Sequence, residues 1–101
     1  MVIEYIRYKI AAEHSDEFET AYADASAALD TSQHCLGYEL SRGVEEPEHW
    51  ILRIEWDSIE GHEQGFRSSQ EFGPFLQAVR PFMGELDEMK HYEATSVAAV
   101  K

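Results

Sequence analysis

The feature that most constrains the fold is the alternation in residues 49–57, HWILRIEWD. The even positions of this segment all carry large apolar residues: Trp50, Leu52, Ile54 and Trp56. The odd positions mix polar and apolar residues: His49, Ile51, Arg53 and Glu55. Because successive side chains of a strand point to opposite faces, the pattern predicts a strand with one face in a core and one mixed face. The core face requires a covering layer on that side of the sheet.

The rest of the chain supplies three further strands. Residues 2–10 are rich in β-branched and aromatic residues and place Ile6, Tyr8 and Ile10 on one face. Residues 35–43 predict a second strand, joined by the turn VEEPEH to residues 49–57 as a hairpin. Residues 85–97 predict a last strand with a weaker, heavily charged pattern.

Two helical regions separate these strands. The first is expected from Ser15, as its cap, to about residue 30, because its apolar residues recur at spacings of 3 and 4: Phe18, Ala21, Tyr22, Ala25 and Leu29. A short helix then opens at Asp57 and Glu60, which fit a capping box, and carries Ile59, His62 and Phe66. A second stripe begins at Phe72, tolerates Pro74 in its first turn and ends at Pro81.

The order β-α-β-β-α-β predicts an α+β fold of the ferredoxin-like plan, with a four-stranded antiparallel sheet and the helices on one face. The 101 residues form a single domain, with a core of about 2–95 and a C-terminal tail of 96–101. Such a small chain buries a modest core and leaves one sheet face open. We therefore expect a homodimer in which two mixed faces pack together.

The charge balance excludes several classes of partner. Twenty acidic and eight basic residues give a formal charge of −12, which disfavours nucleic acid, including the RNA-binding domains that share this plan. No segment reaches the ~18 consecutive apolar residues of a membrane span, and the charged start MVIEYIRYKI is not that of a signal peptide. The single cysteine, Cys35, excludes an internal disulfide framework and suggests the cytoplasm.

Residues 52–79, LRIEWDSIEGHEQGFRSSQEFGPFLQAV, resemble the antibiotic biosynthesis monooxygenase family, as does the strand CLGYEL at 35–40. The shared pattern is an apolar strand that ends in Trp-acidic-Ser, a helix with a histidine, then Ser, Phe and an apolar helix. The resemblance covers roughly residues 2–93. It implies a dimeric α+β barrel in which each protomer holds a pocket between helices and sheet.

The chemistry of the family varies, and two of its branches can be compared residue by residue. The haem-degrading branch needs an asparagine on the first strand, a tryptophan on the short helix and an axial histidine on the next helix. This chain has no asparagine, and the other two positions fall on Gly65 and near Leu76, so we exclude haem degradation. The branch that oxidises phenolic polyketides with molecular oxygen is more similar, although Gly61 and Gly65 stand where its pocket asparagine and tryptophan are expected.

His62 is the candidate catalytic residue. It shares the sheet-facing side of the short helix with Ile59 and Phe66, and a histidine there can also be a core residue paired with a hydroxyl or carboxylate. We favour a pocket position because Gly61 and Gly65 remove side-chain volume and could open a cavity under the helix. An imidazole with a pKa near neutrality could accept a phenol proton.

Further residues are expected to line the pocket as substrate-binding groups: Tyr8, Tyr38, Trp56, Phe66, Phe72 and Phe75. For most of these, simple core packing is the alternative. Arg67 is expected at the surface or an interface rather than as an anion clamp. The pair His34-Cys35 lacks a third group for nucleophilic catalysis, and the five histidines lack metal-ligand spacing, so we expect neither a metal nor another cofactor.

The sequence thus suggests a cofactor-independent monooxygenase that acts on a small aromatic phenol or quinol with O2 as its second partner. Two alternatives stay open. One is a non-catalytic module that binds or assists with the same kind of small ligand. The other is an isomerase or degradative enzyme for a small metabolite, because dimeric α+β barrels host several chemistries.

Overall fold

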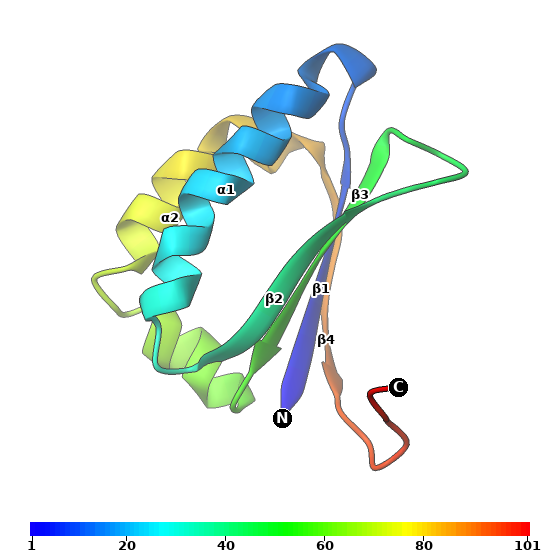
Figure 1. Cartoon of the computed structure of the whole chain (residues 1–101). Coiled ribbons are helices and arrows are strands. Elements are labelled where there is room, and N and C mark those ends of the chain that lie inside the picture. Colours follow the sequence, from blue (N-terminus) through cyan, green and yellow to red (C-terminus); the bar gives the residue numbers. More distant parts are fainter.

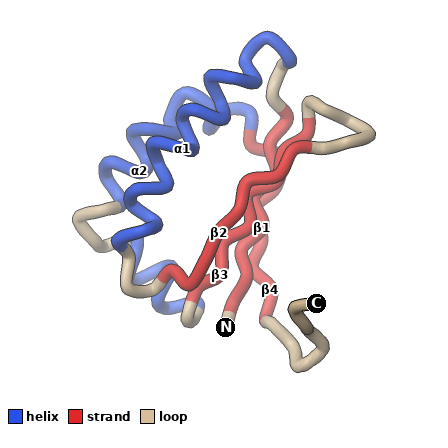
Figure 2. Tube along the Cα trace, viewed as in Figure 1, coloured by secondary structure: helices blue, strands red, loops and turns tan.

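A computed structural model describes residues 1–101 of the chain. The four strands are β1 (Val2–Lys9), β2 (Cys35–Arg42), β3 (His49–Trp56) and β4 (Leu86–Glu93). The helices are η1 (Ala12–His14), α1 (Ser15–Thr31), η2 (Gly61–Phe66), α2 (Phe72–Val79) and η3 (Arg80–Glu85). Figure 1 shows α1 and α2 on the same side of a curved sheet, and Figure 2 shows the same two layers by type of structure. The predicted ferredoxin-like α+β plan is confirmed.

The sheet has the order β2-β3-β1-β4, and all neighbouring strands run antiparallel. The predicted hairpin of β2 and β3 is present, with Glu39 opposite Arg53. In the centre, β1 pairs with β3 and β4, so that Glu4 lies opposite Ile54 on one side and His91 on the other. This register places residues from the two ends of the chain side by side.

The core lies between the sheet and the two helices. All four even positions of β3 are buried there, as the alternation predicts, and Trp56 has no exposed surface at all. Phe18 and Leu29 of α1 and Val79 of α2 close the core from the helix side. Burial of each large apolar side chain contributes about 1.5–3 kcal/mol, which makes this layer the main source of stability.

Both predicted helix starts are wrong in detail. Ser15 does not cap α1, because η1 precedes it and the Ser15 hydroxyl donates instead to the carbonyl oxygen of Ala12. At the short helix, the hydroxyl of Ser58, not the carboxylate of Asp57, accepts the N–H of Gly61 at 2.9 Å. Pro81 lies in η3 directly after α2, as expected.

The far face of the sheet is uncovered within the single chain (Figure 1). It carries mixed side chains, including the partly exposed Ile51 and the ion pair of Arg53 with Glu55. No helix of the chain combines the length and apolarity needed to cross a membrane.

Candidate functional site

A cavity of about 320 Å³ lies between the sheet, η2 and α2. Its walls are mainly apolar, and five of the aromatic residues predicted for the pocket contribute to them: Tyr8, Trp56, Phe66, Phe72 and Phe75. His62 also lines the cavity, whereas Tyr38 does not. Pockets for small ligands are typically this size, mostly apolar and marked by a few convergent polar groups.

Glu4 provides a carboxylate at the polar end of this cavity. Its side chain points from β1 toward the helices and the residue is 1% exposed. The indole N–H of Trp56 donates to Oε1 of Glu4 at 3.1 Å, across the β1–β3 pairing. Burial raises the pKa of Glu4 to about 7, although the Trp56 hydrogen bond and the positive charge of Arg67 act in the opposite direction. The carboxyl group is therefore poised to gain or lose a proton near neutral pH.

His62 lies between Glu4 and His91. Its ring stacks on Trp56, with 4.5 Å between the centroids and 13° between the planes. Nε2 lies 3.5 Å from Oε1 of Glu4, and Nδ1 lies 2.7 Å from Nε2 of His91. The expectation of a pKa near neutrality for His62 is wrong. Burial, together with the positive charge of Arg67 and the presence of His91, lowers the pKa of His62 to about 4. The imidazole is thus neutral at physiological pH.

The backbone of η2 fixes the position of this imidazole. The segment forms a π-helical turn, in which the N–H of Arg67 donates to the carbonyl oxygen of His62 at 3.2 Å. Wide turns of this kind place an extra residue in the turn and are frequent at functional sites. Here the turn directs both His62 and Phe66 toward the sheet, where both are buried.

Glu4, His62 and His91 could together offer three ligand atoms within 4.8 Å of one another to a metal ion. The sequence spacing of the histidines gave no sign of this cluster, because the ligands come from three separate elements. However, two imidazole nitrogens bound tetrahedrally to one ion at about 2.0–2.1 Å stand roughly 3.3 Å apart. Nδ1 of His62 and Nε2 of His91 are closer than this, at 2.7 Å. The 2.7 Å between the two imidazoles is a hydrogen-bond distance, so they form a hydrogen-bonded pair, while Glu4 lies at the longer ion-pair distance of 3.5 Å from His62.

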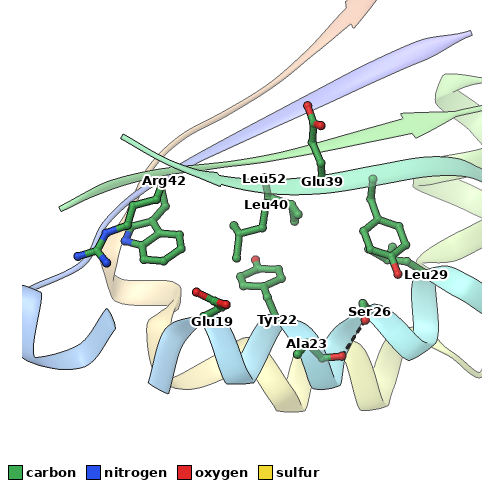
Figure 3. Close-up of a pocket in the computed structure, with 11 residues that line it drawn as sticks. Glu19, Tyr22, Ala23, Ser26, Leu29, Glu39, Leu40, Arg42 and Leu52 are labelled. Atoms are coloured by element: carbon green, nitrogen blue, oxygen red, sulfur yellow. Dashed lines mark hydrogen bonds between the residues drawn. The ribbon is translucent and has the colours of Figure 1, made fainter. Parts of the chain in front are cut away.

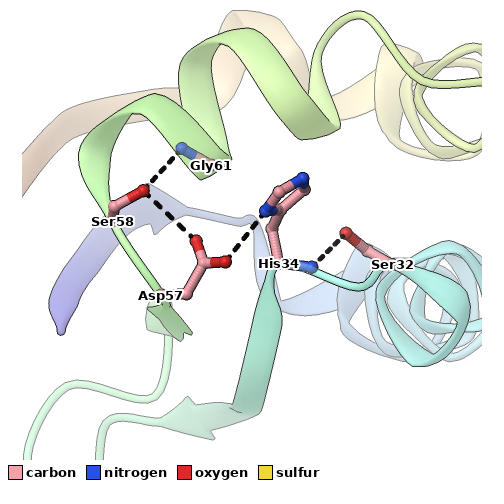
Figure 4. A network of polar contacts seen from close by, with 5 residues as sticks. All are labelled: Ser32, His34, Asp57, Ser58 and Gly61. Atoms are coloured by element: carbon pink, nitrogen blue, oxygen red, sulfur yellow. Dashed lines mark hydrogen bonds and ion pairs between the residues drawn. The ribbon is translucent and has the colours of Figure 1, made fainter.

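Gly61 and Gly65 do not open the cavity, contrary to the sequence interpretation. A Cβ at Gly65 would lie 2.4 Å from Cδ2 of His34, and a Cβ at Gly61 would lie 1.9 Å from Oδ1 of Asp57. Figure 4 shows His34 and Asp57 beside this helix, where Nδ1 of His34 is 2.9 Å from Oδ2 of Asp57. The absence of side chains at Gly61 and Gly65 thus leaves room beside η2 for the contact between His34 and Asp57, which we call the polar clamp.

Tyr38 lies at a different place from the one predicted. Its hydroxyl donates to Oδ1 of Asp30 at 2.6 Å, and it borders a second cavity of about 350 Å³ between α1 and β2–β3 (Figure 3). The indole N–H of Trp50, which also borders this second cavity, is buried without a hydrogen-bond partner. Tyr22 lines both cavities, and its hydroxyl is hydrogen-bonded to that of Tyr8.

The sequence interpretation missed Glu4, Tyr22, Arg67 and His91 as parts of the site. Glu4 could have been identified from the sequence. It is a charged residue at an even position of the first strand, on the same core face as Ile6, Tyr8 and Ile10. Arg67 is exposed, as expected, and also lines the cavity, which was not expected. His91 carried no signal, since its pairing with Glu4 depends on the register of β1 and β4.

Comparison with known proteins agrees with this geometry. A protein from Bordetella bronchiseptica, a candidate antibiotic biosynthesis monooxygenase, superposes with a TM-score of 0.81 over 93% of this chain and 96% of its own, at 22% identity. SnoaB from Streptomyces nogalater, described as a cofactor-independent oxygenase, gives a TM-score of 0.78 over 95% and 94% of the two chains, at 16% identity. At such identities these likenesses concern the fold.

Sequence comparisons point the same way. YczJ of Bacillus subtilis strain 168, an uncharacterized protein, is 27% identical over 77 residues, which are 76% of this chain and 81% of YczJ. The family model described as antibiotic biosynthesis monooxygenase matches residues 1–80, which is most of the chain. The chain therefore belongs to the antibiotic biosynthesis monooxygenase family.

Proposed function

We propose that this protein is a cofactor-independent monooxygenase that oxidises a small aromatic phenol or quinol with O2 in the cavity beneath η2. The observation that carries the proposal is the cavity itself. It combines apolar, largely aromatic walls with one polar end, where a buried carboxyl group and a neutral imidazole meet. A flat aromatic ring suits the walls, and its hydroxyl group suits the polar end.

The reaction would begin with loss of the phenolic proton to the Glu4–His62 pair. The electron-rich anion then passes an electron to O2, and the resulting radicals combine into a carbon-bound peroxide. The peroxide anion first takes back the proton held by the pair and becomes a hydroperoxide. Loss of the C–H proton from that carbon then breaks the O–O bond and forms a carbonyl group, and the departing hydroxide combines with this second proton and leaves as water. One oxygen atom thus enters the product and the other is reduced to water. Exclusion of bulk water protects the anion and the peroxide.

The proposal is tested with anthrones such as dithranol and with naphthoquinols. We expect enzyme-dependent oxygen uptake above the rate of autoxidation, and one atom of ¹⁸O from ¹⁸O2 in the anthrone product by mass spectrometry. Leu76→Trp should fill the cavity and abolish turnover. Ala23→Trp is the matched control, because Ala23 is exposed and does not line the cavity beneath η2, so this variant should retain full activity.

Three outcomes would contradict the proposal. They are no uptake across the panel, a product without added oxygen, or full activity in Leu76→Trp. Thermal stabilisation by a phenol without any turnover would favour the non-catalytic binding module in its place.

A further inference from the structure

Glu4, His62 and His91 come from β1, η2 and β4 and form one continuous polar path through an otherwise apolar region. We propose that these three residues form a proton relay in which Glu4 receives the proton of the substrate, His62 passes a proton on, and His91 exchanges it with solvent. The relay rests on the proposed function for its substrate. The relay goes beyond the proposed function because it gives each of the three residues a defined position in the proton path.

The first argument is the geometry of His62. Each of its two ring nitrogens faces a different partner, since Nε2 lies 3.5 Å from Glu4 and Nδ1 lies 2.7 Å from His91. An imidazole used in this way can accept a proton at one nitrogen while it releases another from the second. Glu4 and His91 also approach each other, with 3.9 Å between Oε2 and Nε2, but only His62 stands within hydrogen-bonding distance of His91.

The second argument is a gradient of exposure along the path. The side chains of Glu4 and His62 are 2% and 6% exposed, whereas that of His91 is 22% exposed. Strand β4 is an edge of the sheet, which gives His91 its access to water. The path thus runs from the buried end of the cavity to the solvent in two steps.

The protons balance, and the negative charge of the deprotonated substrate stays in the cavity until the anion reacts with O2. Glu4 takes the phenolic proton and transfers it to Nε2 of His62, while the proton on Nδ1 of His62 moves to Nε2 of His91. His91 then releases its Nδ1 proton to water, and the carboxylate is restored. The same steps in reverse return a proton to the peroxide anion that the substrate forms with O2.

The surroundings of Glu4 favour this role. Burial raises the pKa of Glu4 to about 7, so the carboxyl group can both accept and release a proton at neutral pH. The titratable and charged groups around it are Tyr8 of β1, Tyr22 of α1, His62 and Glu63 of η2, Arg67 after η2, and His91 of β4. Arg67 opposes and Glu63 favours protonation of the carboxyl group.

The first test does not need a substrate. In ¹⁵N-detected NMR of the imidazoles, titration of the Glu4 carboxyl should switch His62 from the Nδ1–H to the Nε2–H tautomer as Glu4 ionises. The nitrogen signals of His91 should move with the same midpoint. Both changes should vanish in Glu4→Gln. Signals of His62 that stay constant while the Glu4 carboxyl titrates would overturn the relay.

The second test is kinetic, with dithranol as the substrate. His91→Gln should lower kcat at least about tenfold with little change in KM, and added 4-methylimidazole should restore the rate as its concentration rises. His49→Gln is the matched control, because His49 is also a partly buried strand histidine, paired with Glu46 outside the cavity, and should behave as the unchanged protein. Loss of activity in His91→Gln that no buffer restores, or no loss at all, would overturn the relay.

The two tests separate the relay from the oxidation. Coupled imidazole signals together with no oxygen uptake would leave the proton path intact and refute the monooxygenase. Oxygen uptake together with uncoupled imidazole signals would support the monooxygenase and refute the proton relay.

Discussion

A buried carboxyl group links the chemistry of the cavity to the stability of the molecule. Burial raises the pKa of Glu4 from 4.5 to about 7, so the folded chain holds this proton more tightly than the unfolded chain does. The resulting stabilisation is complete below pH 4.5 and is lost as the pH rises through 7. His62 has the opposite sign, because its pKa falls from 6.5 to about 4 and its contribution is lost as the pH falls through that range.

Glu4→Gln tests this linkage. A neutral side chain keeps an acceptor for the Trp56 N–H but never carries the buried charge. One pKa unit corresponds to about 1.4 kcal/mol, so we expect the variant to gain about 3 kcal/mol relative to the unchanged protein between pH 4.5 and pH 9. Urea unfolding at both pH values measures this gain. A stability difference that does not depend on pH would show that Glu4 is ionised without penalty.

At the scale of single elements, η2 depends on the clamp that passes beside it. His34 and Asp57 occupy the space that side chains at Gly61 and Gly65 would need (Figure 4). Their contact joins the start of β2 to the end of β3, and the N–H of Asp57 also donates to the carbonyl oxygen of His34. This clamp lies directly against the turn that carries His62.

Gly65→Ala should destabilise the fold. Its Cβ would displace the His34 ring and break the contact with Asp57, at a cost of about 1–2 kcal/mol, near the lower end of overpacking effects because that ring is partly exposed. Gly73→Ala is the matched control, since nothing lies within 4 Å of its Cβ, and it should stabilise α2 by up to about 1 kcal/mol. Thermal unfolding of the two variants gives the comparison. In a His34→Ala background, Gly65→Ala should lose most of its effect, and a penalty that persists there would exclude the clash as its cause.

At the scale of the whole molecule, one face of the sheet is left uncovered and can be buried by association with another chain. A 101-residue chain buries a limited core, and we propose that a second copy covers the mixed face around Ile51, Arg53 and Tyr5. The charge of −12 per chain works against association, so apolar contacts and ion pairs across the two faces must offset that repulsion.

Analytical ultracentrifugation should therefore give about 23 kDa, twice the mass of the 11.6 kDa chain. Ile51→Lys should place a charge in the centre of the contact and shift the protein to the monomer. Val44→Lys, in the exposed turn between β2 and β3, should leave the mass unchanged. A monomeric unchanged protein would contradict the homodimer.

The sequence by itself determined the arrangement of elements. Alternation in β3 and the helical stripe of α1 are local patterns, and they predict which residues face the core because side-chain direction follows backbone periodicity. The same patterns brought His62 and five aromatic residues to the correct side of the sheet. The caps expected at Ser15 and Asp57 failed for local reasons: the Ser15 hydroxyl donates to the carbonyl oxygen of Ala12, and Ser58 rather than Asp57 accepts the N–H of Gly61.

Only the tertiary structure decided what the polar end of the cavity contains. Glu4 and His91 are 87 positions apart and become neighbours through the register of two strands, which no spacing in the sequence expresses. The pKa shifts of Glu4 and His62 arise from burial, which exists only after the helices close over the sheet. Tyr38 shows the same dependence, because the strand order places β2 at the sheet edge opposite β4, where Tyr38 borders the second cavity. Local periodicity thus determines faces, while register and packing determine which polar groups meet.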